Sequence, residues 1–362
     1  MNNGLFSLHS PQYYQGEIRF GVYAPDTNAG STSTSWIKCD GRFLTNSPAL
    51  SNQLLNNNPN NYNLTIWNTQ ASNFGTTNIQ SIAYGNGTWV AGGDGATLKT
   101  STDTINWNTV TSNFGSSSIY SIAYGNGTWY AGGAGGALRT STDTINWNTQ
   151  TSNFGTSNIQ SIAYGNGTWV AGGAGGALRT STNAVNWNTQ TSNFGASSIV
   201  SIAYSNGTWV AGGSSGTLRT STNTINWNTA TSNFGTSNIN AIAYGNGTWV
   251  AGGVGGTLRT STNTINWNTQ TSNFNGQNVA GITYVNGTWV AGGYNGILRT
   301  STDTVNWNTV TSNLGISSIY SVAYGNIAIA AVGSAGTLRT SNILPFTPNI
   351  NLGNNIYGWM KL

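Results

Sequence analysis

A tryptophan recurs every 40 residues along most of this chain. The seven occurrences are Trp67, Trp107, Trp147, Trp187, Trp227, Trp267 and Trp307. A fixed period of this length is typical of one supersecondary unit that is copied and stacked, because a single unit cannot bury its own apolar face. We therefore expect positions that stay constant between copies to build the architecture, and positions that differ to be available for binding.

Composition indicates a folded chain with an unusual surface. Only 5 % of the 362 residues are charged, against about 25 % in typical globular proteins. Aromatic residues make up 11 % and include 15 tryptophans, which supply more buriable area than disordered chains contain. The surface is therefore expected to consist mainly of amides, hydroxyls and glycine.

The basic residues do not predict a nucleic-acid interface. The net charge is +4 and the pI about 9.2. However, seven of the 11 basic residues recur once per copy, at Lys99, Arg139, Arg179, Arg219, Arg259, Arg299 and Arg339. Nucleic-acid binding needs a patch combined with a groove-fitting element or aromatic platforms. The regular spacing has two interpretations. The seven basic side chains could form a ring-shaped binding site, or each could have the same structural role in its blade, such as capping carbonyls or stacking on tryptophan, which we favour.

Several features bear on where the protein works. A single cysteine, Cys39, excludes an internal disulfide framework. Residues Met1 to Ser10 lack the pattern of a secretion signal, and no apolar run reaches the roughly 20 residues that span a membrane. We expect synthesis in a cytoplasm, no membrane insertion, and release in a virion if the protein acts outside the cell.

Each copy predicts four short strands. In the third copy these are Ser161–Tyr164 (strand a), Thr168–Ala171 (b), Leu178–Ser181 (c) and Trp187–Thr191 (d). An Asn-Gly pair between strands a and b is the strongest short hairpin signal. Four antiparallel strands per copy, in seven copies, predict an all-β, seven-bladed β-propeller. A solenoid is the alternative, but it needs atypical polar ends, and these copies run almost unchanged to both ends.

The phase of the repeat predicts how the ring closes. The array begins at strand d, around Leu64–Ser72, and ends after strand c, at Leu338–Ser341. The first d strand must therefore complete the last blade. This interlocked closure gives a propeller over residues 63–341 and places the flanking segments, 1–62 and 342–362, together as a terminal module on the face that bears the Asn-Gly turns and the c–d corners.

The c–d corner resembles the Asp-box of BNR-like propellers. It reads Ser101-Thr-Asp103-Thr-Ile-Asn-Trp107, one residue shorter than the usual spacing. The acidic position is Asp in three copies (Asp103, Asp143 and Asp303) and Asn in three others (Asn183, Asn223 and Asn263). Either side chain can bond to its own turn backbone, so the motif indicates architecture rather than activity.

The first flanking segment resembles the phage tail-collar domain. The resemblance rests on an early Gly16-Glu17-Ile, on Pro25 before Trp36, and on Cys39-Asp40-Gly41, while the glycine-rich centre of that family is absent. It implies a propeller inserted in a collar-like module, and hence a virion part of a tail or fibre with no chemistry of its own and with other virion proteins as partners. A fibre-like homo-oligomer is a further implication. An unrelated terminal platform is the alternative.

Catalytic and metal-site signals are weak. The propeller region contains no glutamate and no histidine, since Glu17 and His9 precede it. Its four aspartates are Asp94 and the three corner residues, which offer no acid–base pair and no ligand cluster. We therefore expect no enzyme activity, no metal and no cofactor.

Differences between copies collect in the b–c and d–a loops, which lie on the face opposite the termini in a propeller; we call this the variable face. Loops on a rigid scaffold are common recognition sites, and tyrosine with amides suits a neutral glycan. The candidate binding residues are Gln80, Asp94, Tyr120, Gln160, Asn240, Gln277, Asn278, Tyr294 and Tyr320. Neutral drift among duplicated copies is the alternative explanation.

Three functions remain open from the sequence. The first is a virion adhesin whose variable face binds a host surface glycan. The second is a structural virion protein in which the propeller is a spacer, decoration or assembly contact. The third is a free cellular lectin.

Overall fold

The computed structural model describes residues 19–21, 36–38, 67–325 and 328–342. The chain divides into two units, Met1–Asn61 and Tyr62–Leu362. In the first unit, strands β1 (Arg19–Gly21) and β2 (Trp36–Lys38) pair antiparallel, with Phe20 opposite Ile37. Of the collar-like motif, Trp36 begins β2, whereas Gly16, Glu17, Cys39, Asp40 and Gly41 lie outside the described residues. Segments 1–18, 22–35, 39–62 and 343–362 of the expected terminal module lie outside them as well.

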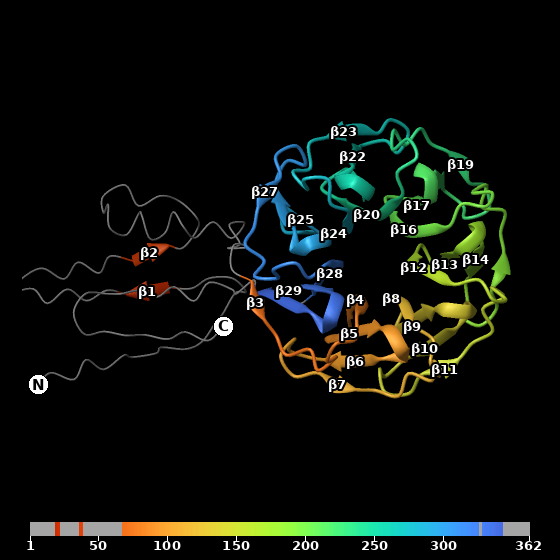
Figure 1. Cartoon of the computed structure of the whole chain (residues 1–362), viewed down its shortest axis with the longest axis horizontal. Helices are drawn as coiled ribbons and strands as arrows, with labels where there is room; N and C mark the ends of the chain where they lie inside the picture. The colour runs from red at the N-terminus through yellow and green to blue at the C-terminus, as the bar shows by residue number, and fades with distance from the viewer. Residues whose placement is uncertain (1–18, 22–35, 39–66, 326–327, 343–362) are drawn as a thin grey trace, which may run out of the picture. The chain divides into compact units, whose positions relative to one another are not determined.

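The second unit is a ring of seven four-stranded antiparallel sheets around a central axis (Figure 1). Strand a of each blade is innermost and contacts strand a of both neighbouring blades. These inner strands are β4 (Ile79–Gly85), β8 (Ile119–Gly125), β12 (Ile159–Gly165), β16 (Ile199–Ser205), β20 (Ile239–Gly245), β24 (Val279–Val285) and β28 (Ile319–Gly325). The expected all-β, seven-bladed propeller is confirmed.

Strands b, c and d follow outward in each blade. The b strands are β5 (Thr88–Gly93), β9 (Thr128–Gly133), β13 (Thr168–Gly173), β17 (Thr208–Gly213), β21 (Thr248–Gly253), β25 (Thr288–Gly293) and β29 (Ala328–Gly333). The c strands are β6 (Leu98–Ser101), β10 (Leu138–Ser141), β14 (Leu178–Ser181), β18 (Leu218–Ser221), β22 (Leu258–Ser261), β26 (Leu298–Ser301) and β30 (Leu338–Asn342). The d strands are β7 (Asn108–Thr109), β11 (Asn148–Thr149), β15 (Asn188–Thr189), β19 (Asn228–Thr229), β23 (Asn268–Gln270), β27 (Asn308–Thr309) and β3 (Asn68–Thr69).

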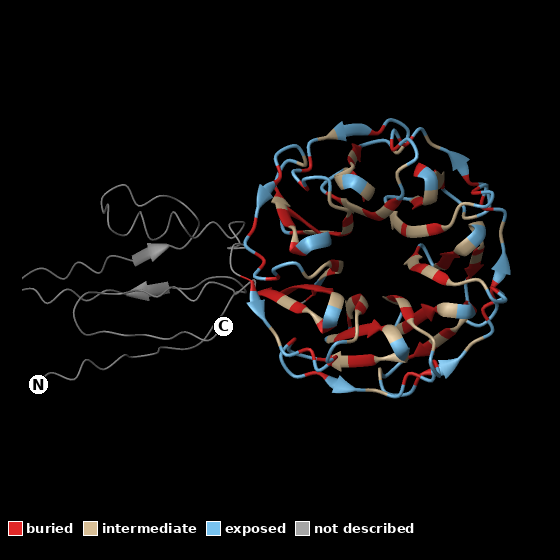
Figure 2. Cartoon of the chain, in the orientation of Figure 1, coloured by how far each residue is buried: buried red, intermediate tan, exposed pale blue. Residues whose placement is uncertain are grey.

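The strands agree with the repeat pattern except at the outer edge. Strand c of the third copy has the expected bounds, and strands a and b extend a little further than expected. Strand d is shorter, because only Asn188 and Thr189 pair with strand c. The outer strands are exposed (Figure 2). Such short, polar edge strands are one way in which sheets avoid pairing with other chains.

The Asn-Gly hairpin and the two glycines that end strand b, which the first six blades share, follow from backbone geometry. Asn166 and Gly167 both have positive φ, 46° and 73°, as a two-residue type I′ turn requires. At the end of strand b, a Cβ on Gly132 would lie 2.6 Å from Cγ2 of Ile159 in the next blade. A Cβ on Gly133 would lie 2.0 Å from the Ser118 carbonyl oxygen. The Gly-Gly pair therefore allows close packing both between and within blades.

The core lies between neighbouring blades rather than inside each one. In one cluster, Tyr130 and Leu138 of the second blade pack with Ile159, Trp169 and Trp187 of the third. All seven tryptophans of the 40-residue ladder are at most 4 % exposed. The Ser81 hydroxyl also accepts a 3.0 Å hydrogen bond from the Ile122 amide of the next blade, and the three following junctions repeat this bond.

Ring closure has the expected interlocked form. Strand β3 completes the sheet of β28, β29 and β30, with Asn68 opposite Thr340 and Thr69 opposite Arg339. The Ser72 hydroxyl donates a 2.6 Å hydrogen bond to the Gly336 carbonyl. The described chain leaves the ring at Asn342, which pairs with Ala328 at the start of strand b. The entry strand and the exit strand thus share one blade.

Candidate binding face

The b–c and d–a loops lie on the same face of the ring. Each b–c connection is a single 3-10 turn, and the amide of its first residue bonds to a carbonyl of the d–a loop, as Asp94 does to Asn78 at 3.1 Å. These turns are η1 (Asp94–Ala96), η2 (Ala134–Gly136), η3 (Ala174–Gly176), η4 (Ser214–Gly216), η5 (Val254–Gly256), η6 (Tyr294–Gly296) and η7 (Ser334–Gly336). The variable face therefore carries both sets of loops.

Two of the candidate tyrosines come together on this face. Tyr294 begins η6 of the sixth blade, and Tyr320 lies on β28 of the seventh. Their ring centroids are 6.0 Å apart and their planes meet at 72°, an edge-to-face contact. Tyr294 is 38 % exposed, whereas Tyr320 is half-buried. Burial raises the pKa of the Tyr320 hydroxyl, and nearby Tyr294 and Asp94 raise it further.

Asp94 is held by two amides of its own blade. Gln80 Nε2 donates to Asp94 Oδ1 at 3.0 Å, and Asn78 Nδ2 donates to Asp94 Oδ2 at 2.9 Å. The other amide atom of Asn78, Oδ1, accepts a 3.0 Å bond from the Ala335 amide of the seventh blade. Asn78 thus connects Asp94 to the blade that bears Tyr320. Sequence comparison between copies did not single out Asn78, although four copies carry Asn and three carry Ser at this position.

The other candidate residues do not form one group. Tyr120 lies on β8, which contacts the Asp94 turn, and Gln160 lies half-buried on β12. Asn240 donates from Nδ2 to the Val279 carbonyl of the next blade at 3.1 Å. Asn278 Oδ1 accepts a 3.0 Å bond from the Gly255 amide, and the amide of Gln277 bonds to the Phe274 carbonyl. Asn240 and Asn278 therefore join blades to each other.

The recurring basic residues have an intramolecular role. Arg139 donates from Nε and Nη2 to the Asn113 carbonyl and from Nη1 to the Leu138 carbonyl. Its guanidinium lies 4.9 Å from the centroid of the Phe114 ring. Each of the later arginines also donates to a d–a loop carbonyl. The aromatic partner is a phenylalanine and not the tryptophan that we expected, because Phe114 lies in the loop that the arginine spans.

The corner motif forms a self-contained turn. Asp103 Oδ1 accepts hydrogen bonds from the amides of Ile105 and Asn106, both at 2.8 Å. Asn106 Nδ2 donates to Asp103 Oδ2 at 2.7 Å. These donors, Asn106 first, hold the pKa of the Asp103 carboxyl well below its usual range. The indole of Trp107 donates to the Thr104 carbonyl, which anchors the turn to the core.

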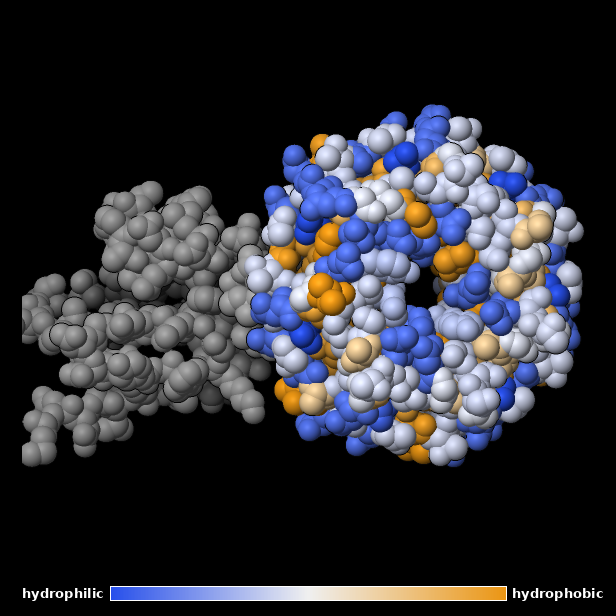
Figure 3. All heavy atoms as spheres, in the orientation of Figure 1, coloured by the Kyte–Doolittle hydropathy of each residue, from blue (hydrophilic) through white to orange (hydrophobic). Residues whose placement is uncertain are grey.

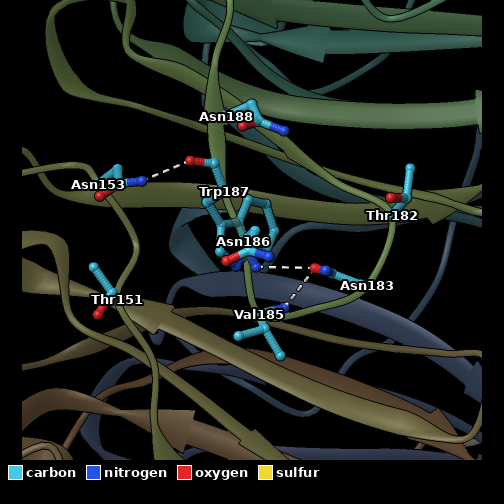
Figure 4. Close-up of a pocket in the computed structure, with 8 residues that line it drawn as sticks. All are labelled: Thr151, Asn153, Thr182, Asn183, Val185, Asn186, Trp187 and Asn188. Carbon is cyan, nitrogen blue, oxygen red and sulfur yellow. Dashed lines mark hydrogen bonds between the residues drawn. The ribbon is translucent and has the colours of Figure 1, made fainter.

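Grooves open between neighbouring blades beside the c–d corners (Figure 4). One of about 520 Å³ is lined by Thr151, Asn153, Thr182, Asn183, Val185, Asn186, Trp187 and Asn188. Two of its polar side chains are already paired: Asn153 Nδ2 donates to the Trp187 carbonyl, and Asn183 Oδ1 accepts from two turn amides. A second groove has the corresponding position between the first two blades. These grooves belong to the repeated architecture.

Apolar surface is scattered on the face drawn in Figure 3, where the ring is open at its centre. Within residues 67–325 and 328–342, no group of acidic, histidine or cysteine side chains has the arrangement of a metal site. None of the described helices has the length and apolar character needed to cross a membrane.

Comparisons with known proteins give the fold. No protein-family model matches the chain, and no curated protein matches its sequence. A solved structure described as "YCF48 bound to D1 peptide" is 16 % identical, with a TM-score of 0.64 over 78 % of this chain and 96 % of that chain. YCF48 from Cyanidioschyzon merolae is also 16 % identical, with a TM-score of 0.62 over 77 % and 99 %. The WD40 propeller domain of Doa1 is 14 % identical, with a TM-score of 0.63 over 77 % and 96 %. The chain is therefore a seven-bladed β-propeller whose solved structural neighbours include a WD40 domain.

Proposed function

We propose that this chain is a non-enzymatic binding protein of a virion, and that its variable face recognises a glycan on a host surface. The observation that supports this most is the cluster of Tyr294, Tyr320 and Asp94, which joins three blades at positions where the residue varies between copies. A scaffold repeated so closely has no structural need for different residues at these positions. Tyrosine rings and a carboxylate suit a ligand rich in hydroxyl groups.

The chemistry of the propeller supports binding rather than catalysis. Three of its four carboxylates accept hydrogen bonds within their own corner turns. The basic side chains that recur once per blade span loops. An acid–base mechanism needs a pair of groups that a substrate can reach, and Asp94 is the one remaining carboxylate in the described part of the ring.

The structural neighbours indicate that this fold presents surfaces to macromolecules. The YCF48 structure contains a D1 peptide bound to that protein. With 16 % identity, the neighbour gives no ligand for this chain, so a peptide ligand remains an outcome that the experiment distinguishes. We favour a glycan because the variable face bears amides, hydroxyls and tyrosine rings, and the b–c and d–a loops include only one carboxylate, Asp94.

The test is binding of the full chain to an immobilised glycan library, together with host adsorption by particles that lack the protein. We expect binding to a limited set of glycans and reduced adsorption. A silent library together with undiminished adsorption would contradict the proposed function. Binding by free protein, with a secretion route and no association with particles, would instead favour a cellular lectin.

A structural role in the virion is the second candidate, and a different observation favours it. Each of six corners exposes one β-branched aliphatic side chain by more than half: Ile105, Ile145, Val185, Ile225, Ile265 and Val305. Repeated exposed apolar residues on one side of a ring suit an assembly contact. Replacing all six by serine should then remove the protein from particles while leaving glycan binding intact. Under the adhesin hypothesis alone, incorporation would not change.

A further inference from the structure

We propose that Tyr294, Tyr320 and Asp94 form a single saccharide subsite at the ring closure, and that it takes a sugar residue without negative charge. This inference rests on the proposed function and makes it more specific. Such a site is asymmetric, because the equivalent positions of the other blades carry different combinations of residues. The three residues come from the sixth, seventh and first blades, whose strands β24, β28 and β4 are consecutive in the ring (Figure 1).

Ring closure is what assembles the site. Turn η6, which starts at Tyr294, contacts β28, which carries Tyr320. Strand β28 in turn contacts β4, whose residue Gln80 donates to Asp94. Asn78 links the seventh blade to Asp94 through its two amide atoms. A continuous chain of contacts therefore runs from Tyr294 to Asp94 across two blade junctions.

The two tyrosines provide a flat apolar surface with polar tips. Tyr320 supports Tyr294 from the side through the edge-to-face contact, so the partly exposed Tyr294 ring is held in place. An exposed, supported aromatic ring packs well against the C–H face of a sugar. At each of the six other b–c turns the corresponding residue is smaller: Asp94, Ala134, Ala174, Ser214, Val254 and Ser334. No other turn offers such a ring.

Asp94 sets the charge preference of the subsite. A carboxylate has about four lone-pair sites, and Gln80 and Asn78 occupy one on each oxygen. One acceptor site on each oxygen is left, which suits two neighbouring hydroxyl groups. Both protein donors are neutral amides, so within the described residues no cation compensates the charge of Asp94. A sialic or uronic acid placed here would face an uncompensated like charge, which is strongly disfavoured.

The repeat supplies substitutions that other blades already contain. Asp94→Ala introduces the residue of Ala134, Tyr294→Ala that of Ala174, and Tyr320→Gln that of Gln160. Each variant therefore has a side chain that the same backbone position accepts elsewhere in the ring. Val254→Ala and Val200→Gln are matched controls, since they make similar changes at equivalent positions of other blades.

The experiment is binding of the full chain and these variants to an array of glycans in pairs that differ only in a terminal sialic acid. We expect the wild type to bind neutral members and not their sialylated twins. Each of the three subsite variants should weaken binding to the neutral glycans about tenfold or more. Asp94→Ala should also reduce the difference in affinity between the neutral and the sialylated member of each pair. The two control variants should match the wild type.

Two outcomes would overturn the inference in distinguishable ways. If the wild type binds but Tyr294→Ala, Tyr320→Gln and Asp94→Ala bind equally well, the subsite is wrong and the proposed glycan function stands. A preference for the sialylated twins likewise contradicts the role of Asp94 alone. If the wild type binds no glycan on the array, both the subsite and the glycan function fail.

Discussion

Gln70 donates a 2.8 Å hydrogen bond from Nε2 to the Thr340 hydroxyl, although 270 positions separate the two residues. The same bond joins Gln150 to Thr140 inside the second blade, where only 10 positions intervene. The two pairs have the same local geometry and differ only in connectivity. In the second blade the c–d corner links strands c and d directly, whereas in the last blade no such corner joins the outer strand β3 to strand c, and only non-covalent contacts hold β3 to its sheet.

Replacing Gln70 by proline should therefore destabilise the protein more than replacing Gln150 by proline. The amides of Gln70 and Gln150 donate to the carbonyls of Leu338 and Leu138 at 3.1 and 3.0 Å, and proline removes the donor. Proline also removes the side-chain bond to threonine, so Gln150→Pro should cost about 2 kcal/mol of unfolding free energy. Gln70→Pro should lower the melting temperature further, because β3 can leave the ring. Thermal unfolding of the two variants tests this, and equal losses would mean that the closing strand is no weaker than the others.

Removing the hydroxyl of Tyr130 should make the protein more stable. This side chain replaces the valine of most copies, is fully buried, and has a hydroxyl without a hydrogen-bond partner among the described residues. An unsatisfied buried polar group costs about 1–3 kcal/mol, so Tyr130→Phe should raise the melting temperature. Tyr164→Phe, at a half-buried ring, is the control. A lower melting temperature for Tyr130→Phe would show that the hydroxyl has a stabilising partner.

Tyr130 should also make the stability of the protein depend on pH in the alkaline range. Burial raises the pKa of Tyr130 above that of an exposed tyrosine, which is about 10. Because the unfolded chain releases this proton first, stability is complete below about pH 10 and falls as the pH rises above it. The wild type should lose stability more steeply than Tyr130→Phe in this range. Chemical unfolding at a series of pH values measures the difference, and parallel curves would contradict it.

The aspartates of the three acidic c–d corners should make the stability of the protein fall at low pH. Hydrogen bonds from the following Asn and its neighbour hold the pKa values of Asp103, Asp143 and Asp303 below the ordinary value, so their contribution is present above about pH 4 and lost as the pH falls through the depressed values. Replacing all three by Asn, the residue of three other corners, should flatten the loss of stability on acidification. Unfolding curves at decreasing pH test this; an unchanged slope would contradict it.

Gly133 and Gly135 allow the cost of a steric clash to be compared with the cost of an unfavourable backbone conformation. Gly133→Ala places a Cβ against the Ser118 carbonyl oxygen, which cannot rotate away, and should cost about 3 kcal/mol. Gly135 has φ of 60° with open space around it, and Ala335 occupies the same position in the last blade. Gly135→Ala should therefore cost only about 1 kcal/mol. Denaturant unfolding compares the two, and the reverse order would contradict this account of the Gly-Gly pair.

Much of the scaffold follows from local sequence rules. The Asn-Gly turns and the bounds of strand c are set by neighbours within one 40-residue copy, so each copy specifies them independently. The burial of the tryptophans, in contrast, needs the neighbouring blade. Strand d is the exception: Trp187 to Thr191 reads as a longer strand, but only Asn188 and Thr189 pair, because the chain must then turn to reach the next blade.

The sequence by itself determined the number of blades, the interlocked closure and the face on which copies differ, because period and phase are one-dimensional properties. Only the tertiary structure decided which differing residues meet. Tyr294 and Tyr320 meet where the sixth blade packs on the seventh, and closing the ring puts the seventh blade beside the first, which carries Asp94. It also decided that Asn240 and Asn278 bond to adjacent blades, since hydrogen-bond partners 39 and 23 residues away become visible only when the blades are packed together.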